Sequence, residues 1–333
     1  MSSWVRESSK VSMAKQDVNK LSDTCRYFVR LAFLVVKIPF LCCKSLVVSL
    51  YPAKLKDISN DIVLITGGSR GIGRQIALEI AKHKPEHIVL WGRGIANLER
   101  TAAEVRSLGI KCSYMSCDLG VKEQIYSKAQ EIKDTIGPVS ILVNNAGVVT
   151  GRKIVDSVEE EVEATFAVNT LAHIWTLKAF LPDMMDSQKG HIVTMSSVLS
   201  MITMAGLSDY CSSKFSTTGL CESLYWEVEE YPNIFMTSVH PYLVINDMFS
   251  ALKLRFPRLI PALSEKYVAE RTVQAVLTNT SYIIMPRIMY IIVLAQRIFP
   301  DSVLLPIYKF LGTDTAMDNF LSPKSSLPKV KSS

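Results

Sequence analysis

Between residues 61 and 241, short apolar runs alternate with longer segments of helical periodicity. The runs lie at 61–66, 87–92, 111–119, 139–147, 190–197 and 234–241, and the helical segments include 98–108, 159–185 and 209–230. Short runs that are apolar at nearly every position are typical of parallel strands, which are buried on both faces. The alternation therefore predicts a single doubly wound α/β domain, in which helices cover both faces of a parallel sheet.

The first run leads into a glycine-rich turn, with the sequence LITGGSRGIGRQIA at residues 64–77. Gly67 permits a tight turn, Gly71 lets a pyrophosphate approach the backbone, and Gly73 lets the next helix pack closely on the strand. The N-terminus of that helix presents N–H groups and a positive dipole to phosphates. The turn therefore predicts a dinucleotide site, and its expected cofactor-binding residues are Gly67, Ser69, Arg70, Gly71, Ile72 and Gly73.

A cation follows the second apolar run. Enzymes that use NAD usually carry an Asp or Glu here, about 20 residues past the glycines, to bind the adenosine ribose hydroxyls. This chain has Gly92 and Arg93 at that position. Arg93, together with Arg70 of the glycine turn, offers guanidinium donors to a 2′-phosphate. The pair predicts NADPH as the cofactor, and reduction as the working direction.

Tyr210 and Lys214 are four residues apart on an expected helix, so their side chains share one face. An adjacent ammonium favours the phenolate and should lower the tyrosine pKa from about 10 toward the working range of a general acid. Ser197 follows a buried run, at the sheet edge where ligands bind in open parallel sheets. We therefore expect Ser197, Tyr210 and Lys214 to meet over one cofactor.

These motifs together resemble the short-chain dehydrogenase/reductase superfamily over about residues 60–245. The resemblance rests on the glycine turn, Asp118 in CDL, NNAG at 144–147, Asn169 in VNT, Ser197, and the Y-x-x-x-K motif at 210–214. Further segments are similar to the membrane-bound retinal reductase branch of that superfamily. Among them are IVLWGR, KAFLP, DYCSSK, RFPRLIP and VAERTVQAV.

The resemblance implies a role for each motif residue. Tyr210 protonates the carbonyl oxygen of the substrate as the hydride arrives, Lys214 holds the nicotinamide ribose, and Ser197 orients the carbonyl oxygen. Asn169 supports a water that relays protons. Additional cofactor contacts are implied for Asp118 at the adenine edge, and for Asn144, Ala146, Gly147, Pro241 and Asn246.

The chain departs from the family after the sixth run. Many relatives have Pro-Gly and then a threonine there, whereas this chain has Pro241, Tyr242 and Asn246. An asparagine side chain can make a hydrogen bond to the carboxamide comparable to that of threonine.

The function that the resemblance implies is NADPH-dependent reduction of a hydrophobic aldehyde, all-trans-retinal to all-trans-retinol. It further implies an endoplasmic reticulum membrane or a lipid droplet as the location, with the catalytic domain facing the cytosol. Reduction of a steroid 17-ketone or a long-chain lipid carbonyl remains an alternative, as does a non-catalytic lipid-binding scaffold. The four intact motif residues argue against the scaffold. A homo-oligomer and a hetero-oligomer with a related dehydrogenase both remain open.

An apolar segment at residues 27–54 is interrupted by Arg30, Lys37 and Lys44. Cations seven residues apart stay within a narrow helical stripe, because the stripe drifts by only about 20° per repeat. The pattern favours a helix that lies in the membrane interface over one that crosses the bilayer. A cleaved signal peptide and a packed core helix are weaker alternatives, since the apolar part starts late and covers more than one face.

Composition limits the partners. The net charge is +6, but no basic run with interleaved aromatic residues occurs, which excludes nucleic acid. Seven cysteines lack metal-ligand or disulfide spacing, so we expect reduced thiols and no metal. The expected organisation is a polar segment 1–26, a membrane anchor 27–54, a dinucleotide-binding catalytic domain 55–250, substrate-lid and membrane-contacting helices 251–320, and a disordered tail 321–333.

Overall fold

The computed structural model describes residues 25–41, 43, 54–245, 255, 260–315 and 317. The chain divides into two units, residues 1–54 and 55–333. In the first unit, residues 25–41 are helical, as expected, and Lys44 lies outside the described residues. Its large apolar side chains, from Tyr27 to Leu41, are between 43% and 74% exposed. Among the helices that are described, none combines the length and the apolar character needed to cross a membrane.

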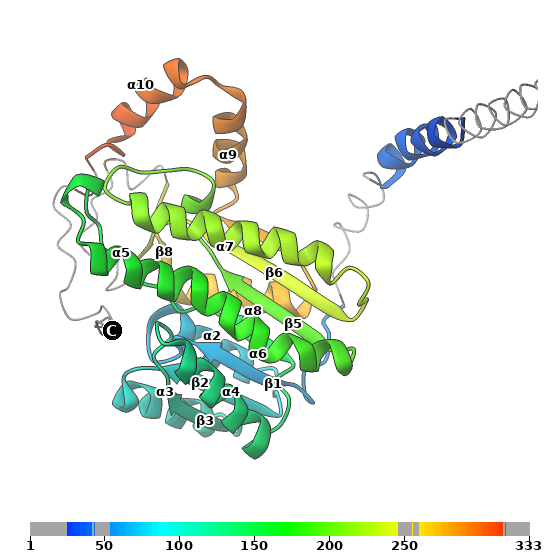
Figure 1. The fold of residues 1–333 in the computed structure, drawn as a ribbon, viewed down its shortest axis with the longest axis vertical. Coiled ribbons are helices and arrows are strands. Elements are labelled where there is room, and N and C mark those ends of the chain that lie inside the picture. Colours follow the sequence, from blue (N-terminus) through cyan, green and yellow to red (C-terminus); the bar gives the residue numbers. More distant parts are fainter. Residues whose placement is uncertain are drawn as a thin grey trace, which may run out of the picture. The chain divides into compact units, whose positions relative to one another are not determined.

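The second unit is built on a seven-stranded parallel sheet with the strand order β3-β2-β1-β4-β5-β6-β9 (Figure 1). The strands are β1 Ile62–Thr66, β2 His87–Gly92, β3 Lys111–Ser116, β4 Ile141–Asn144, β5 Gly190–Met195, β6 Ile234–Pro241 and β9 Tyr282–Met285. The predicted doubly wound sheet is confirmed, and β9 adds a strand that the sequence pattern did not indicate.

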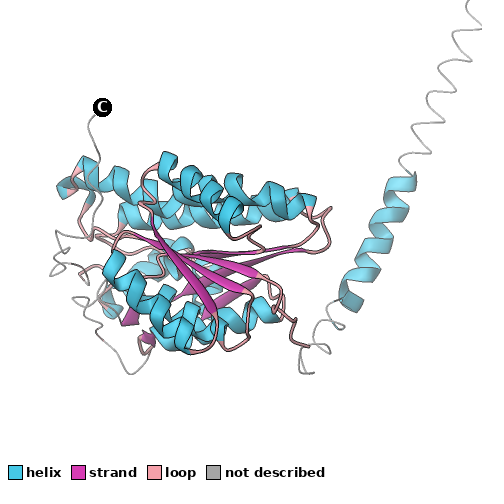
Figure 2. Cartoon of the chain, turned by 90° about the horizontal axis from the view of Figure 1, so that it is seen from below, coloured by secondary structure: helices cyan, strands magenta, loops and turns pink. Residues whose placement is uncertain are grey.

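Two helical layers enclose the sheet (Figure 2). One layer consists of α2 Gly71–Ala81, α3 Ile95–Ser107 and α8 Glu265–Leu277. The other consists of α4 Lys122–Thr135, α5 Glu159–Phe166, α6 Ala172–Asp186 and α7 Ser208–Glu227. Successive side chains of a strand point to opposite faces, so Val63 and Ile65 of β1 pack into the first layer, and Ile62 and Leu64 into the second. Burial on both faces explains why the strands read as continuous apolar runs.

The segment expected to be one helix at 159–185 is interrupted. A π-helical turn, η2 Ala167–Leu171, separates α5 from α6 and carries Asn169. Such turns are frequent at functional sites because they redirect the side chains of a helix.

The C-terminal part continues as α9 Ile288–Ile298 and α10 Asp301–Leu311. Pro286 and Pro300 lie at element boundaries, as expected of residues that cannot extend a helix. Pro306 lies inside α10, which tolerates the loss of one backbone donor. A small parallel pair, β7 Val244–Ile245 and β8 Leu263–Ser264, follows β6.

Candidate active site

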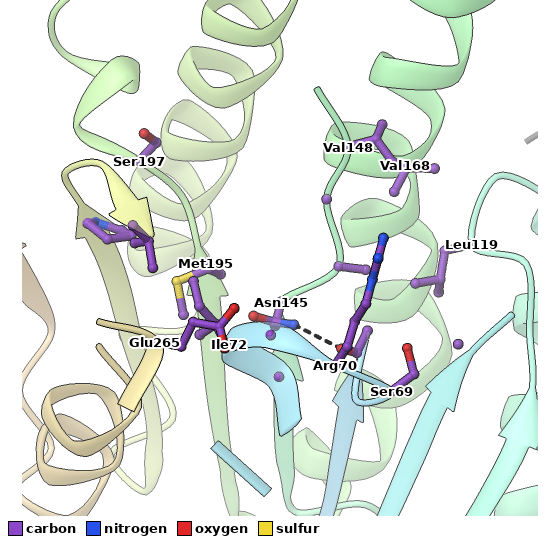
Figure 3. A pocket seen from close by; sticks show the side chains of 18 of the residues that line it. Ser69, Arg70, Ile72, Leu119, Asn145, Val148, Val168, Met195, Ser197 and Glu265 are labelled. Atoms are coloured by element: carbon purple, nitrogen blue, oxygen red, sulfur yellow. Dashed lines mark hydrogen bonds between the residues drawn. The ribbon is translucent and has the colours of Figure 1, made fainter. Parts of the chain in front are cut away.

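A pocket of about 540 Å³ lies at the carboxyl ends of the central strands (Figure 3). Strand order reverses between β1 and β4, and in open parallel sheets ligands bind at this switch point. The glycine turn forms one side of the pocket, and the ends of β2 to β6 and the start of α8 contribute the other lining residues. In Figure 3, Ser69 and Arg70 lie on one side and Met195 and Ser197 on the other.

Three glycines fix the shape of the turn. Gly67 and Gly71 have φ angles of 68° and 62°, which disfavour residues with a Cβ atom. A Cβ on Gly73 would lie 2.3 Å from the Gly67 carbonyl oxygen and 2.6 Å from Asn145 Nδ2. Helix α2 begins at Gly71 and has no acidic residue in its first turn. Its N-terminus therefore presents backbone donors at the pocket, as an anion site requires.

Arg70 and Arg93 both line the pocket, and both are exposed. Arg93 directly follows the end of β2, and the Arg70 side chain extends from the glycine turn into the pocket (Figure 3). Asp118 lines the pocket after β3, where its carboxylate accepts a hydrogen bond from the Gly120 N–H at 3.0 Å. The two arginines and Asp118 thus follow the carboxyl ends of the neighbouring strands β1, β2 and β3.

Ser197, Tyr210 and Lys214 line the same pocket, although they come from the end of β5 and from α7. All three are buried residues of the pocket wall. Helical periodicity explains the pairing of Tyr210 with Lys214, and the crossing of α7 behind β5 explains their approach to Ser197.

The Lys214 ammonium group is held by a backbone carbonyl. Its Nζ donates to the Met195 carbonyl oxygen at 2.9 Å and lies 5.8 Å from the centre of the Tyr210 ring. Burial lowers the pKa of Lys214 to about 8. An ammonium group has three donors, and within the described residues Met195 is its one hydrogen-bond acceptor. The remaining donors suit hydroxyl groups of a bound ligand.

The environment of Tyr210 differs from the expectation. Burial raises the pKa of Tyr210 above its ordinary value, and a hydrogen bond with Ser197 opposes this effect without cancelling it. The expected lowering by Lys214 is therefore not found in this structure, because removing the phenolate from water costs more than the Ser197 hydrogen bond returns. The phenol is protonated at neutral pH and is ready to donate a proton.

The Ser197 hydroxyl has a defined direction. Its oxygen accepts a hydrogen bond from the Leu199 N–H at 3.1 Å, at the start of the 3₁₀ turn η3 Val198–Ser200. This bond uses a lone pair of the oxygen, so the one hydroxyl hydrogen can be donated to the Tyr210 oxygen or to the oxygen of a bound substrate.

Asn169 lies behind the pocket wall rather than in the pocket. Its amide accepts from the Val148 N–H at 2.8 Å and donates to the Val148 carbonyl at 2.9 Å and to Ser213 Oγ at 3.0 Å. Its backbone carbonyl accepts from Thr217 Oγ1 at 2.8 Å. These bonds join the segment after β4 to α7. Gly147 lies close to the same groups, since a Cβ at this position would be 3.3 Å from Asn169 Oδ1 and 3.6 Å from Lys214 Nζ. Its role in holding a water stays a prediction.

In the NNAG segment, the asparagine that lines the pocket is the one directly after the expected residue. Asn144 is buried away from the pocket, and its Oδ1 accepts from Thr176 Oγ1 at 2.9 Å, so its expected contact with a cofactor does not fit this geometry. Asn145, which sequence reasoning missed, lines the pocket and donates from Nδ2 to the Thr66 carbonyl at 2.9 Å. Of the other expected contacts, Ala146, Gly147, Ser69, Ile72 and Pro241 line the pocket, and Asn246 lies outside the described residues.

Several pocket residues lie outside the expected set of site residues. Val148, Val168, Tyr242 and Val244 form apolar parts of the wall, and Glu265 at the start of α8 lies beside the glycine turn. Its Oε1 is 3.3 Å from the position that a Gly71 Cβ would occupy. Only the packing of α8 on α2, far apart in the sequence, brings this carboxylate to the pocket.

Comparisons with known proteins agree with this geometry. The family model described as short chain dehydrogenase matches residues 61–255. Human short-chain dehydrogenase/reductase 3 is 42% identical over 281 residues, which cover 84% of this chain and 93% of the relative. Human epidermal retinol dehydrogenase 2 is 37% identical over 287 residues, covering 85% and 93%. A metagenomic short-chain oxidoreductase solved in complex with NADP superposes with a TM-score of 0.58 at 26% identity, covering 69% of this chain and 97% of that one.

Proposed function

The chain belongs to the short-chain dehydrogenase/reductase family, and from that premise we propose that it reduces a lipophilic aldehyde, all-trans-retinal, to the alcohol with NADPH. Family membership makes it an oxidoreductase. The observation that carries the proposal is one pocket with Ser197, Tyr210 and Lys214 in one part and Arg70 and Arg93 in another. Relatives named retinol dehydrogenases support a retinoid substrate.

The residues of the pocket fit a dinucleotide. The N-terminus of α2 and the glycine turn would hold the pyrophosphate, Arg70 and Arg93 the 2′-phosphate, and Lys214 the nicotinamide ribose. The buried ammonium of Lys214, with one hydrogen-bond acceptor within the described residues, supports this assignment. When bound, the reduced nicotinamide supplies the hydride.

The side chains of the pocket would perform the rest of the reaction. Ser197 donates its hydroxyl hydrogen to the substrate carbonyl oxygen and makes the carbonyl carbon more electrophilic. Tyr210, protonated because burial raises its pKa, donates a proton to the same oxygen as negative charge develops there. Overall, the aldehyde gains a hydride at carbon and a proton at oxygen.

The surroundings of the pocket suit an apolar substrate that arrives from lipid. Met289, Ile292 and Val293 of α9 pack in one cluster with Val198, beside Ser197, and with Tyr242 of the pocket wall. The other side of α9 exposes apolar residues, among them Ile291, Leu294 and Ile298, each at least 60% exposed. We propose that this surface meets the membrane next to the substrate entrance.

The C-terminal segment also contributes to the proposed lid. Met317 packs in a cluster with Leu207 and Tyr210, and its Cβ is 2.8 Å from the position that a Gly206 Cβ would occupy. Gly206 has a φ angle of 77° and leaves room for Met317. This contact supports a role for Met317 in covering the catalytic tyrosine.

The N-terminal helix is proposed as an interfacial anchor. Arg30 and Lys37 are seven residues apart on a helix whose large apolar side chains are exposed. We place the enzyme at the endoplasmic reticulum or a lipid droplet, with the catalytic domain facing the cytosol. Deletion of residues 1–54 should release the protein from membranes in a flotation assay, and retention of the truncated protein would make the α9–α10 region the main attachment.

A substrate panel tests the proposed activity. Membranes that contain the full chain are supplied with NADPH and, separately, with all-trans-retinal, a steroid 17-ketone or a long-chain fatty aldehyde. Formation of retinol at the highest kcat/KM supports the proposal. Faster turnover of the ketone or the fatty aldehyde would mean that this compound, and not retinal, is the substrate. No turnover of any of them would favour the lipid-binding scaffold.

A further inference from the structure

We propose that His240 is a positioning residue for Ser197, and that it acts by holding the turn η3 through hydrogen bonds. The inference rests on the proposed carbonyl reduction. His240 lies on β6, directly before Pro241 of the pocket wall, and its side chain is fully buried. Its Nδ1 is 3.1 Å from Ser200 Oγ and 3.3 Å from the Ser197 carbonyl oxygen. Its Nε2 is 2.8 Å from Ser238 Oγ.

The directions of these hydrogen bonds follow from the number of hydrogens. Ser200 Oγ donates its one hydrogen to the Ser197 carbonyl at 2.7 Å, so it can only accept from His240. Nδ1 therefore carries the imidazole hydrogen, and Nε2 accepts from the Ser238 hydroxyl. Burial lowers the pKa of His240 to about 4, which keeps the ring neutral and preserves this assignment at physiological pH.

The ring itself is held in place. The centres of the His240 and Tyr282 rings are 4.4 Å apart with 36° between their planes. Tyr282 comes from β9, and its hydroxyl donates to Met201 Sδ, immediately after η3, at 3.1 Å. The imidazole is thus fixed by strand β9 on one side and by η3 on the other.

These contacts determine the orientation of Ser197. The carbonyl of Ser197 is held by Ser200 and His240, and its hydroxyl oxygen by the Leu199 N–H. Without the imidazole donor, Ser200 loses a partner and the turn can rotate. A displacement of the hydroxyl by about 1 Å is enough to cost on the order of a hundredfold in rate.

A double-mutant cycle tests this inference in the full chain. His240→Phe keeps a ring for Tyr282 but removes both nitrogens, and we expect it to lower kcat for aldehyde reduction by at least about tenfold, with the affinity for NADPH unchanged. His240→Asn places an amide donor near the position of Nδ1 and should restore most of the activity. In a Ser197→Ala background, His240→Phe should change kcat by less than about twofold, because the residue it positions is already gone.

The matched control is His191→Phe, which removes a buried histidine of the adjacent strand β5 that bonds Lys56 and Thr237 instead. Thermal unfolding of every variant shows whether a loss of kcat reflects a loss of folded protein. An equal loss of kcat from His240→Phe in both backgrounds, or an Asn variant as impaired as the Phe variant, would overturn the inference while leaving the proposed function intact. Absence of turnover by the wild type would overturn both.

Discussion

The Lys214 ammonium nitrogen lies 2.9 Å from the backbone carbonyl oxygen of Met195, and its side chain is only 3% exposed. Burial lowers the Lys214 pKa to about 8, so the free protein loses this charge as the pH rises through that value. Ribose hydroxyls and an anionic cofactor favour the charged form. Cofactor binding should therefore be accompanied by proton uptake above pH 8.

This linkage predicts a pH-dependent affinity. Between about pH 8 and 10, the dissociation constant for NADPH should rise by up to tenfold per pH unit, which a fluorescence titration measures. Lys214→Arg keeps its charge throughout this range and should show a flat profile. A flat profile in the wild type would contradict the prediction.

The choice of cofactor depends on Arg93. Arg93→Asp replaces a donor to the 2′-phosphate by an acceptor for ribose hydroxyls, so kcat/KM with NADPH should fall by about a hundredfold and kcat/KM with NADH should rise. Arg100→Asp makes the same change of charge on the exposed surface of α3, outside the pocket, and serves as the control. An unchanged ratio in the Arg93 variant would remove the argument for NADPH.

Gly73 should tolerate no side chain. A Cβ at this position would lie 2.3 Å from the Gly67 carbonyl oxygen, so Gly73→Ala must displace the glycine turn. We expect a loss of about 1–3 kcal/mol in the free energy of unfolding and at least a tenfold weaker binding of NADPH. In Gly94→Ala, the nearest atom to the new Cβ is Asn97 Nδ2 at 3.7 Å. The Gly94 variant should retain cofactor affinity, and equal losses in both variants would show that close packing at Gly73 is not the cause.

The buried histidines predict loss of stability in mild acid. Burial lowers the pKa of His173 to about 3 and that of His240 to about 4, and His191 shifts in the same direction. Above about pH 6.5, the pKa of a histidine in the unfolded chain, the neutral rings do not reduce the stability of the fold. As the pH falls below this value toward the pKa values of the folded chain, the free energy of unfolding decreases by up to about 1.4 kcal/mol per pH unit for each histidine.

His173→Leu isolates one of these contributions. Within the described residues, the ring nitrogens of His173 form no hydrogen bond of good geometry, and the Ala146 backbone, which partly opposes the effect of burial on the His173 pKa, offers at most a weak one. An apolar side chain at this position therefore leaves little hydrogen bonding unmade. Denaturant titrations at pH 7.5, 6.0 and 5.0 should show a shallower decline for this variant than for the wild type. Parallel declines would mean that His173 is not the group that takes up the proton.

Local patterns in the sequence predicted the sheet and the glycine turn because their causes are local. Continuous apolar runs mark strands buried on both faces, and Gly67, Gly71 and Gly73 are required by the backbone of one turn. The direction of the Tyr210 pKa shift was not predictable, because desolvation depends on the packing of distant segments such as Met317. The support of Ser197 by His240 likewise joins residues 43 positions apart. Asn145 was missed because only the end of β4 decides which asparagine turns toward the pocket.

The central claim is that Tyr210 donates the proton in an NADPH-driven carbonyl reduction. The most direct measurement is the single-turnover rate of retinal reduction in membranes that carry the full chain or its Tyr210→Phe variant, with cofactor binding checked in both. We expect the variant to bind NADPH but to reduce retinal at least about a thousandfold more slowly, since it loses both the proton donor and its hydrogen bond to the substrate oxygen. A variant that reduces retinal within tenfold of the wild-type rate would contradict the account.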